Sequence, residues 1–305
     1  MKKQPIIVIV GPTASGKTDV SIQLASKLNG EIISADSRQF YQRMDIGTAK
    51  PTNAELALVP HHLINVANPS APWSLAMFQE SAKKCIEELY SRSKVPFIVG
   101  GTGQYVWGLI EGWLVPSQPI NPALRNSLEA WAVDLGAQGI HQVLSRLDPP
   151  AGEIVQVENI RRTVRALEVI FSSGKRFSDQ RLKNPPDYDF LILGITWDRL
   201  ALYQRVDMRI EIMLNTGLVE EVRSLLDSGL DPQTSAMSAI GYREIVGYLT
   251  GMHSLEEAVV LMKRNTRQYI RRQANWFKVT DPRIAWFQAG NQLAERMEKY
   301  INNRG

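Results

Sequence analysis

Eight residues near the N-terminus have the types and spacing that bind phosphate. They are Gly11, Pro12, Thr13, Ala14, Ser15, Gly16, Lys17 and Thr18, and they fit the G-x-x-x-x-G-K-[ST] pattern. In such a loop, backbone N–H groups and the start of the next helix point at an anion. Lys17 would place a positive charge on the phosphoryl oxygens, and the Thr18 hydroxyl would be a ligand for Mg²⁺. The motif predicts a phosphate site without specifying the reaction.

The loop lies between a predicted strand and a predicted helix. Ile6 to Val10 is an apolar run, and Val20 to Leu28 carries apolar residues at helical spacing. Similar patterns predict strands over 31–35, 95–99 and 190–197 and a helix over 74–90. A further short strand is expected over 63–66, and the chain after residue 197 is expected to be mostly helical. Buried strands that alternate with helices predict an α/β fold, a P-loop NTPase-like parallel sheet flanked by helices.

Asp36 follows the second predicted strand, and Ser37, Arg38 and Gln39 come directly after it. Ligands bind at the carboxyl ends of strands in open α/β sheets, so Asp36 is expected near the phosphate loop. Three roles remain open from the residues alone: a chemical base, a ligand for Mg²⁺, or a cap for the following segment.

A glycine turn follows the strand at 95–99. It reads Gly100-Gly101-Thr102, and its glycines allow the backbone to approach a ligand closely. This strand ends in no carboxylate, whereas many phosphate-loop hydrolases hold their metal with an aspartate at such a position. The turn therefore argues against an ordinary ATPase.

The composition changes over Pro116 to Glu158, where prolines bracket amphipathic segments. We predict a helical insert over 116–158, within a core formed by 1–115 and 159–305. A further helix is predicted over Asn159 to Phe171. Its cations Arg161 and Arg165 have Glu158 and Glu168 at helical spacing, which favours ion pairs within the helix.

A basic segment lies near the C-terminus. Residues 263–278 contain no Asp or Glu, and their cations are Lys263, Arg264, Arg267, Arg271, Arg272 and Lys278. Helical spacing places Arg264, Arg267 and Arg271 on one face. The apolar residues expected opposite are Val259, Met262, Ile270 and Phe277. Because ordinary solvated faces mix signs, this face predicts contact with a polyanion, with plain solvated surface as the alternative.

The composition of the 305 residues limits the classes of protein. Net charge is +4, 44% of residues are hydrophobic, and the single cysteine, Cys85, suits a reducing compartment. The four histidines have no recognised zinc spacing. No apolar stretch reaches the ~18 residues of a membrane span, so we expect a cytoplasmic protein with no membrane partner.

Together these motifs resemble the tRNA dimethylallyltransferase family, also called tRNA isopentenyltransferases or IPP transferases. The resemblance covers most of the chain, and it rests on residues 11–18, 34–37, 44–51, 100–102, 159–168, 240–243 and 266–273. It implies transfer of a dimethylallyl group from dimethylallyl diphosphate to N6 of adenosine 37 in the tRNA anticodon stem-loop. The products would be N6-isopentenyladenosine and diphosphate, with Mg²⁺ as cofactor and a monomeric enzyme.

The resemblance also implies roles for individual residues. The phosphate loop would hold the donor diphosphate together with Arg205, although spacing leaves Arg209 open. Asp36 would be the general base, acting with Lys17 and Thr102. The implied tRNA contacts are Asp36, Ser37, Arg38, Gln39, Thr102, Arg125, Arg161, Arg162, Thr163, Val164 and Arg165. Arg264, Arg267 and Arg271 join them from the basic segment, so that the insert and this helix would hold the RNA from two sides.

Three alternatives differ in substrate or class. A small-molecule kinase would use the loop for ATP and Asp36 as base, and would not need the basic segment. A related enzyme would prenylate free AMP. An RNA-binding module with an inactive loop would bind tRNA without releasing diphosphate.

Overall fold

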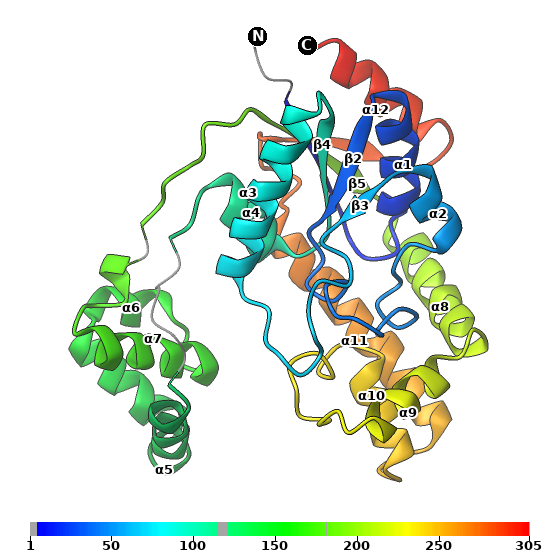
Figure 1. Cartoon of the computed structure of the whole chain (residues 1–305). Helices are drawn as coiled ribbons and strands as arrows, with labels where there is room; N and C mark the ends of the chain where they lie inside the picture. The colour runs from blue at the N-terminus through cyan, green and yellow to red at the C-terminus, as the bar shows by residue number, and fades with distance from the viewer. Residues whose placement is uncertain (1–4, 115–120, 181, 305) are drawn as a thin grey trace. The chain divides into compact units, whose positions relative to one another are not determined.

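The computed structural model describes residues 5–114, 121–180 and 182–304 (Figure 1). The chain forms two compact units. Unit 1 consists of Met1–Ile110 and Asp187–Gly305, and unit 2 consists of Glu111–Pro186.

Within the described residues, unit 1 contains one six-stranded parallel sheet in the order β3-β2-β4-β1-β5-β6. The strands are β1 (Ile6–Val10), β2 (Gly30–Ser34), β3 (His61–His62), β4 (Val95–Val99), β5 (Phe190–Thr196) and β6 (Ile284–Gln288). Ile7 lies opposite Phe97 on one side and Leu191 on the other. All residues of β1, β2 and β4 are buried, as expected for strands covered on both faces. The predicted α/β fold is confirmed.

Helices cover both faces of the sheet (Figure 1). Those of unit 1 are α1 (Lys17–Lys27), α2 (Asn53–Leu58), α3 (Leu75–Ser91), α4 (Gly103–Ile110), α8 (Arg199–Asn215), α9 (Leu218–Asp227), α10 (Tyr242–Leu249), α11 (Leu255–Trp276) and α12 (Leu293–Asn302). Ile7 and Ile9 share a core cluster with Leu24 of α1 and Met297 of α12. Burial of these side chains fixes the start of α1, and hence the phosphate loop, against the end of β1.

Two strands of the sheet differ from the sequence prediction. A short strand was expected at Leu63–Val66, but the strand lies at His61–His62, where it pairs with Ile32 and Ile33 of β2. The C-terminal third was expected to be mostly helical, yet Ile284–Gln288 forms β6 beside β5. Both strands are at the edges of the sheet, so they lack the fully buried pattern that identifies the central strands.

Unit 2 is helical. It contains α5 (Pro122–Leu147), α6 (Pro149–Ile154), α7 (Ile160–Ser173) and the short 3₁₀ helix at Ser178–Gln180. Non-helical backbone at Gly136 divides α5 into two segments. One core cluster joins Leu128, Ile140 and Leu144 of α5 to Val164 and Leu167 of α7.

The predicted limits of the insert need correction. The expected boundary at residue 116 lies outside the described residues, and unit 2 begins at Glu111. The boundary at 158/159 is wrong, because α7 packs its apolar side chains against α5 within unit 2. Among the described helices, none has the length and apolar composition needed to cross a bilayer.

Candidate active site

The phosphate loop joins β1 to α1. Gly16 has φ 86°, in the left-handed region that glycine adopts without steric cost, and α1 begins at the next residue. The Lys17 ammonium folds back over the loop and donates to the carbonyl oxygens of Gly11 and Pro12, at 3.1 and 2.7 Å. The Ser15 hydroxyl is buried and has no hydrogen-bond partner. The loop thus carries a cation and an unsatisfied polar group that a phosphate could engage.

The charge of Lys17 depends on its surroundings. Burial lowers the pKa of Lys17 to about 8, because desolvation disfavours the ammonium, and the Arg209 cation acts in the same direction. The carboxylate of Asp36 opposes this shift. Lys17 is therefore mostly protonated at neutral pH and loses its proton as the pH rises through about 8.

An open cavity of about 370 Å³ borders the loop. The cavity is lined by the residues of the loop from Thr13 to Thr18 and by Asp36, Gln39, Ala49, Lys50, Pro51, Arg205 and Arg209, among others. A second cavity of about 40 Å³ is bordered by Lys17, Thr18 and Asp36. The structure therefore brings the predicted phosphate site and the predicted base to the same space.

Asp36 follows β2 at the carboxyl edge of the sheet and is half-buried. Its Oδ1 accepts a hydrogen bond from the backbone N–H of Arg38 at 2.9 Å. The next residue, Ser37, donates its backbone N–H to Thr102 Oγ1 at 3.1 Å. This bond ties the Asp36 segment to the glycine turn after β4, so the structure places the three predicted catalytic residues, Lys17, Asp36 and Thr102, at one edge of the sheet.

Arg38 and Gln39 already have partners within unit 1. Arg38 donates to Ser235 O at 2.6 Å and to Ser238 Oγ at 3.3 Å. The Gln39 amide donates to Ala49 O at 3.2 Å and accepts from the Ser34 hydroxyl at 2.9 Å. These bonds fix neighbouring loops, and a tRNA contact by either side chain stays a prediction.

Arg205 and Arg209, between which spacing could not decide, both border the large cavity. Arg205 donates to Ala14 O at 2.9 Å, and its guanidinium lies 4.6 Å from the centre of the Trp197 ring. For Arg209, the described residues provide no hydrogen bond or ion pair. Burial lowers the pKa of Arg209, and the Arg205 cation acts in the same direction, whereas Asp36 and Asp19 oppose the shift. Arg205 supports the loop, and Arg209 is the cation available to an anionic ligand.

Gln273 on α11 was not predicted as a site residue. It is buried, accepts from the Thr13 backbone N–H at 2.9 Å and donates to Gly101 O at 3.0 Å. The sequence held one signal for this role: helical spacing places Gln273 on the same face as the apolar Met262. A polar residue on an apolar face is expected to be buried and to need hydrogen-bond partners. Nearby, burial raises the pKa of Tyr269 to about 12, with Asp36 acting in the same direction, so its hydroxyl stays neutral.

The basic face of α11 is only partly free. Arg264 and Arg271 are exposed. Arg267 instead donates to both carboxylate oxygens of Asp207 on α8, at 2.9 and 2.7 Å, and lies 5.1 Å from the centre of the Tyr203 ring. The prediction of an acid-free face considered only the charges of one helix, and it is corrected for Arg267, because a neighbouring helix supplies the acid.

In unit 2, the buried carboxylate of Glu168 organises the cations. Arg165 lies 2.8 Å from it and Arg125 lies 3.7 Å from it, so both have a structural partner. The side chains of Thr163 and Val164 are buried, so a tRNA contact at these two positions stays a prediction that only their backbone could fulfil. Arg161 is exposed and remains accessible.

The donors at the loop are compatible with Mg²⁺. Mg²⁺ prefers oxygen ligands and keeps several waters. The Thr18 hydroxyl and the Asp36 carboxylate belong to residues that line the same cavity. Among the described residues, no three His, Cys, Asp or Glu side chains gather as a metal site of their own. A magnesium ion at this edge would therefore depend on the Thr18 hydroxyl and on oxygens of the bound diphosphate.

Comparisons with known proteins identify the family of the chain. The model of the family described as IPP transferase matches residues 39–280, and that of isopentenyl transferase matches residues 4–64. A "tRNA dimethylallyltransferase" of Thermomicrobium roseum is 43% identical over 98% of this chain and 92% of its own length. The protein of the same name from Carboxydothermus hydrogenoformans is 44% identical over 99% of this chain and 98% of its own length.

Solved structures show the same similarity. The tRNA isopentenylpyrophosphate transferase of Bacillus halodurans is 38% identical with a TM-score of 0.74, over 99% of this chain and 97% of that one. A eukaryotic dimethylallyltransferase described as acting on tRNA has a TM-score of 0.83 at 29% identity, over 99% and 80%. With the family model across most of its length and relatives above 40% identity over nearly all of it, the chain belongs to the IPP transferase family.

Proposed function

We propose that this protein transfers a dimethylallyl group from dimethylallyl diphosphate to N6 of adenosine 37 in tRNA, giving N6-isopentenyladenosine and diphosphate. Membership of the IPP transferase family and the names of its relatives support this function. The observation that carries it is the position of Asp36 and Lys17 on one cavity, a base beside a diphosphate site. The enzyme acts as a monomer in the cytoplasm.

The phosphate loop holds the leaving group. On binding, the diphosphate replaces the Gly11 and Pro12 carbonyl oxygens as the partner of the Lys17 ammonium, and Arg209 adds a second positive charge. Both cations stabilise the negative charge that grows on the diphosphate as the carbon–oxygen bond breaks. The Thr18 hydroxyl would hold Mg²⁺ together with the diphosphate, and the ion would supply further charge neutralisation.

Asp36 removes the proton. The adenine amino nitrogen attacks the first carbon of the allyl group, the bond from that carbon to the diphosphate oxygen breaks, and the amino proton passes to the Asp36 carboxylate. The Arg38 backbone N–H holds Oδ1, which leaves Oδ2 for the amine. Thr102 fixes the neighbouring backbone through Ser37, so the carboxylate keeps its direction.

The tRNA contacts combine backbone and base recognition. Adenosine 37 must leave the stack of the anticodon loop before N6 can reach the donor. Arg264 and Arg271 on α11 and Arg161 on α7 are the exposed cations that contact phosphates. Such contacts position the RNA without reading its sequence.

Mass analysis of tRNA nucleosides tests this function directly. The protein is incubated with dimethylallyl diphosphate, Mg²⁺ and either unmodified tRNA or AMP, and release of diphosphate is measured in parallel. Prenylated adenosine in the tRNA alone is the expected result. Prenylated AMP would indicate an enzyme that acts on free AMP. ATP-dependent phosphorylation of an added acceptor would indicate a kinase. Binding of tRNA without release of diphosphate would indicate an RNA-binding module.

A further inference from the structure

We propose that Glu221 on α9 is a positioning residue for the donor site, acting through the turn at 44–51. This inference rests on the proposed function. It gives the Glu221 carboxylate, which does not border the large cavity, a role in the same reaction. The turn lies between α9 and the cavity, so Glu221 acts on the substrates only through it.

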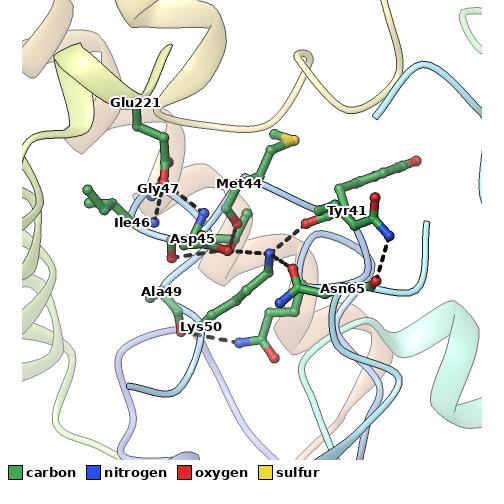
Figure 2. Close-up of polar contacts among 12 residues, drawn as sticks. Tyr41, Met44, Asp45, Ile46, Gly47, Ala49, Lys50, Asn65 and Glu221 are labelled. Atoms are coloured by element: carbon green, nitrogen blue, oxygen red, sulfur yellow. Dashed lines mark hydrogen bonds and ion pairs between the residues drawn. The ribbon is translucent and has the colours of Figure 1, made fainter. Parts of the chain in front are cut away.

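The Glu221 carboxylate accepts three successive backbone N–H groups of the turn. Its Oε2 accepts from Asp45 and Ile46, both at 2.8 Å, and its Oε1 accepts from Gly47 at 3.1 Å (Figure 2). Three adjacent N–H groups that converge on one anion form a strong, directional site, and hydrogen bonds to an ionised acceptor are about twice as strong as neutral ones. The turn is thus held by a charge from a helix more than 170 residues away in sequence.

Glu221 is itself held in place by α10. The Tyr242 hydroxyl donates to Glu221 Oε1 at 2.5 Å, and the Tyr242 ring is fully buried. A Cβ at Gly47 would lie 2.5 Å from this ring, so only glycine allows the turn to pack so closely. Burial, with Glu221 as a further cause, raises the pKa of Tyr242, which keeps the hydroxyl protonated as a donor.

The other side of the turn is fixed by Lys50. Its side chain is only 4% exposed, and its ammonium donates to Tyr41 O, Asp45 Oδ1 and Asn65 Oδ1 at 2.5, 2.6 and 2.5 Å (Figure 2). All three ammonium protons are used within the protein. Lys50 is therefore a structural anchor, although its side chain borders the cavity.

The turn connects these anchors to the chemistry. Ala49, Lys50 and Pro51 form part of the wall of the large cavity. Ala49 O accepts from the Gln39 amide, and Gln39 in turn accepts from Ser34, the last residue of the strand before Asp36. A displacement of the turn would alter both the donor cavity and the bonds beside the base. Because misplacement by about 1 Å can lower a rate roughly 100-fold, Glu221 can affect catalysis without touching either substrate.

Glu221→Gln tests the proposal, because an amide keeps the shape but cannot accept all three N–H groups. Glu220→Gln is the matched control, since both residues lie in the first turn of α9 and only Glu220 is exposed. Tyr242→Phe is a second variant that keeps the ring against Gly47 and removes the hydroxyl. Each protein is assayed for kcat, KM of dimethylallyl diphosphate, Kd of tRNA, thermal midpoint and Kd of inorganic diphosphate.

The expected result separates positioning from stability. Glu221→Gln should raise the KM of the donor and lower kcat, each by about tenfold, with the Kd of tRNA within about twofold of the parent. Tyr242→Phe should cause a smaller change of the same kind, and Glu220→Gln none. Parent-like kinetics in Glu221→Gln would overturn the inference. A parallel loss of thermal midpoint and of affinity for both substrates would also overturn it, because it would reduce Glu221 to a stabilising residue.

The parent enzyme distinguishes this inference from the proposed function. If the parent transfers no prenyl group, the proposed function fails. The binding of inorganic diphosphate then decides the inference, which requires weaker binding in Glu221→Gln than in Glu220→Gln.

Discussion

Gln273 and the Thr13 backbone N–H form a hydrogen bond of 2.9 Å across 260 residues of sequence. The same side chain donates to Gly101 O at 3.0 Å, so one amide joins the phosphate loop to the glycine turn beside Thr102. A Cβ at Gly101 would lie 2.1 Å from Gln273 Nε2, so a larger residue there would displace the Gln273 amide from this position. The spacing between the donor loop and the Thr102 turn therefore depends on α11.

Gln273→Leu should lower kcat/KM by roughly 10- to 100-fold. Leucine fills the space but leaves Thr13 N and Gly101 O without their partner, and both groups would have to shift or remain unsatisfied. Steady-state kinetics measure the effect, and the exposed Gln268→Leu on the same helix is the control. Equal kinetics in the two variants would contradict the role assigned to Gln273.

Asp36→Ala should lower kcat by roughly 100- to 10,000-fold, the range for loss of a general base. Donor binding should change little, because the diphosphate is held by the loop and by Arg209. Single-turnover transfer to tRNA and calorimetry with the donor measure the two quantities. Turnover within a few fold of the parent would show that another group accepts the proton.

The affinity for diphosphate should depend on pH through Lys17. Its pKa in the free protein is lowered to about 8, so the ammonium is present below pH 8 and is lost above it. Since the diphosphate binds the protonated form, affinity should fall as pH rises through 8, by up to about tenfold per unit. Calorimetry between pH 6.5 and 9.5 tests this. The Lys17→Arg variant stays charged over this range, so its affinity for diphosphate should no longer depend on pH. If the variant kept the pH dependence of the parent, another group would be its cause.

Arginines on α11 should separate into two classes. Arg264→Gln and Arg271→Gln should each weaken cognate and non-cognate tRNA alike, and reduce the slope of log K against log salt by roughly 0.7 to 0.9. Arg267→Gln should leave this slope nearly unchanged. It should lower the free energy of unfolding by about 1 kcal/mol, because it breaks the pair with Asp207. Asp207→Asn should reproduce that loss of stability. A large decrease of the salt slope in Arg267→Gln would instead show that Arg267 contacts the RNA.

Local signals were sufficient for the centre of the fold and for the motifs. The apolar runs of β1 and β4, and the isoleucines Ile32 and Ile33 of β2, each indicate a buried strand. Ser74 accepts a hydrogen bond from the Met77 backbone N–H, as an N-cap residue does. The phosphate loop and Asp36 were identified because their spacing is local and because the carboxyl ends of parallel strands share one edge.

Features that depend on distant partners could not be predicted. Glu221 has the sequence of an ordinary helix residue, and the register of Gln273 with Met262 indicates burial without naming a partner. Only the fold brings these side chains to Gly47 and Thr13. The limits of unit 2 were wrong for the same reason, since the apolar face of α7 fits a sheet or a helix equally well until its partner α5 is known. Arg267 was expected to be free for RNA because its ion-pair partner, Asp207, lies on another helix.

The order of strands also constrains how the protein is made. β1 lies between β4 and β5, and β5 lies against β6, so two of the six strands come from residue 190 onward. A growing chain that has passed β4 leaves β1 with an unpaired edge until β5 emerges, about 90 residues later, or several seconds at bacterial-type rates of synthesis. During this interval the strand that carries the phosphate loop is exposed to pairing with other chains. Truncated products that end before Phe190 are therefore expected to aggregate and to be substrates for chaperones and proteases.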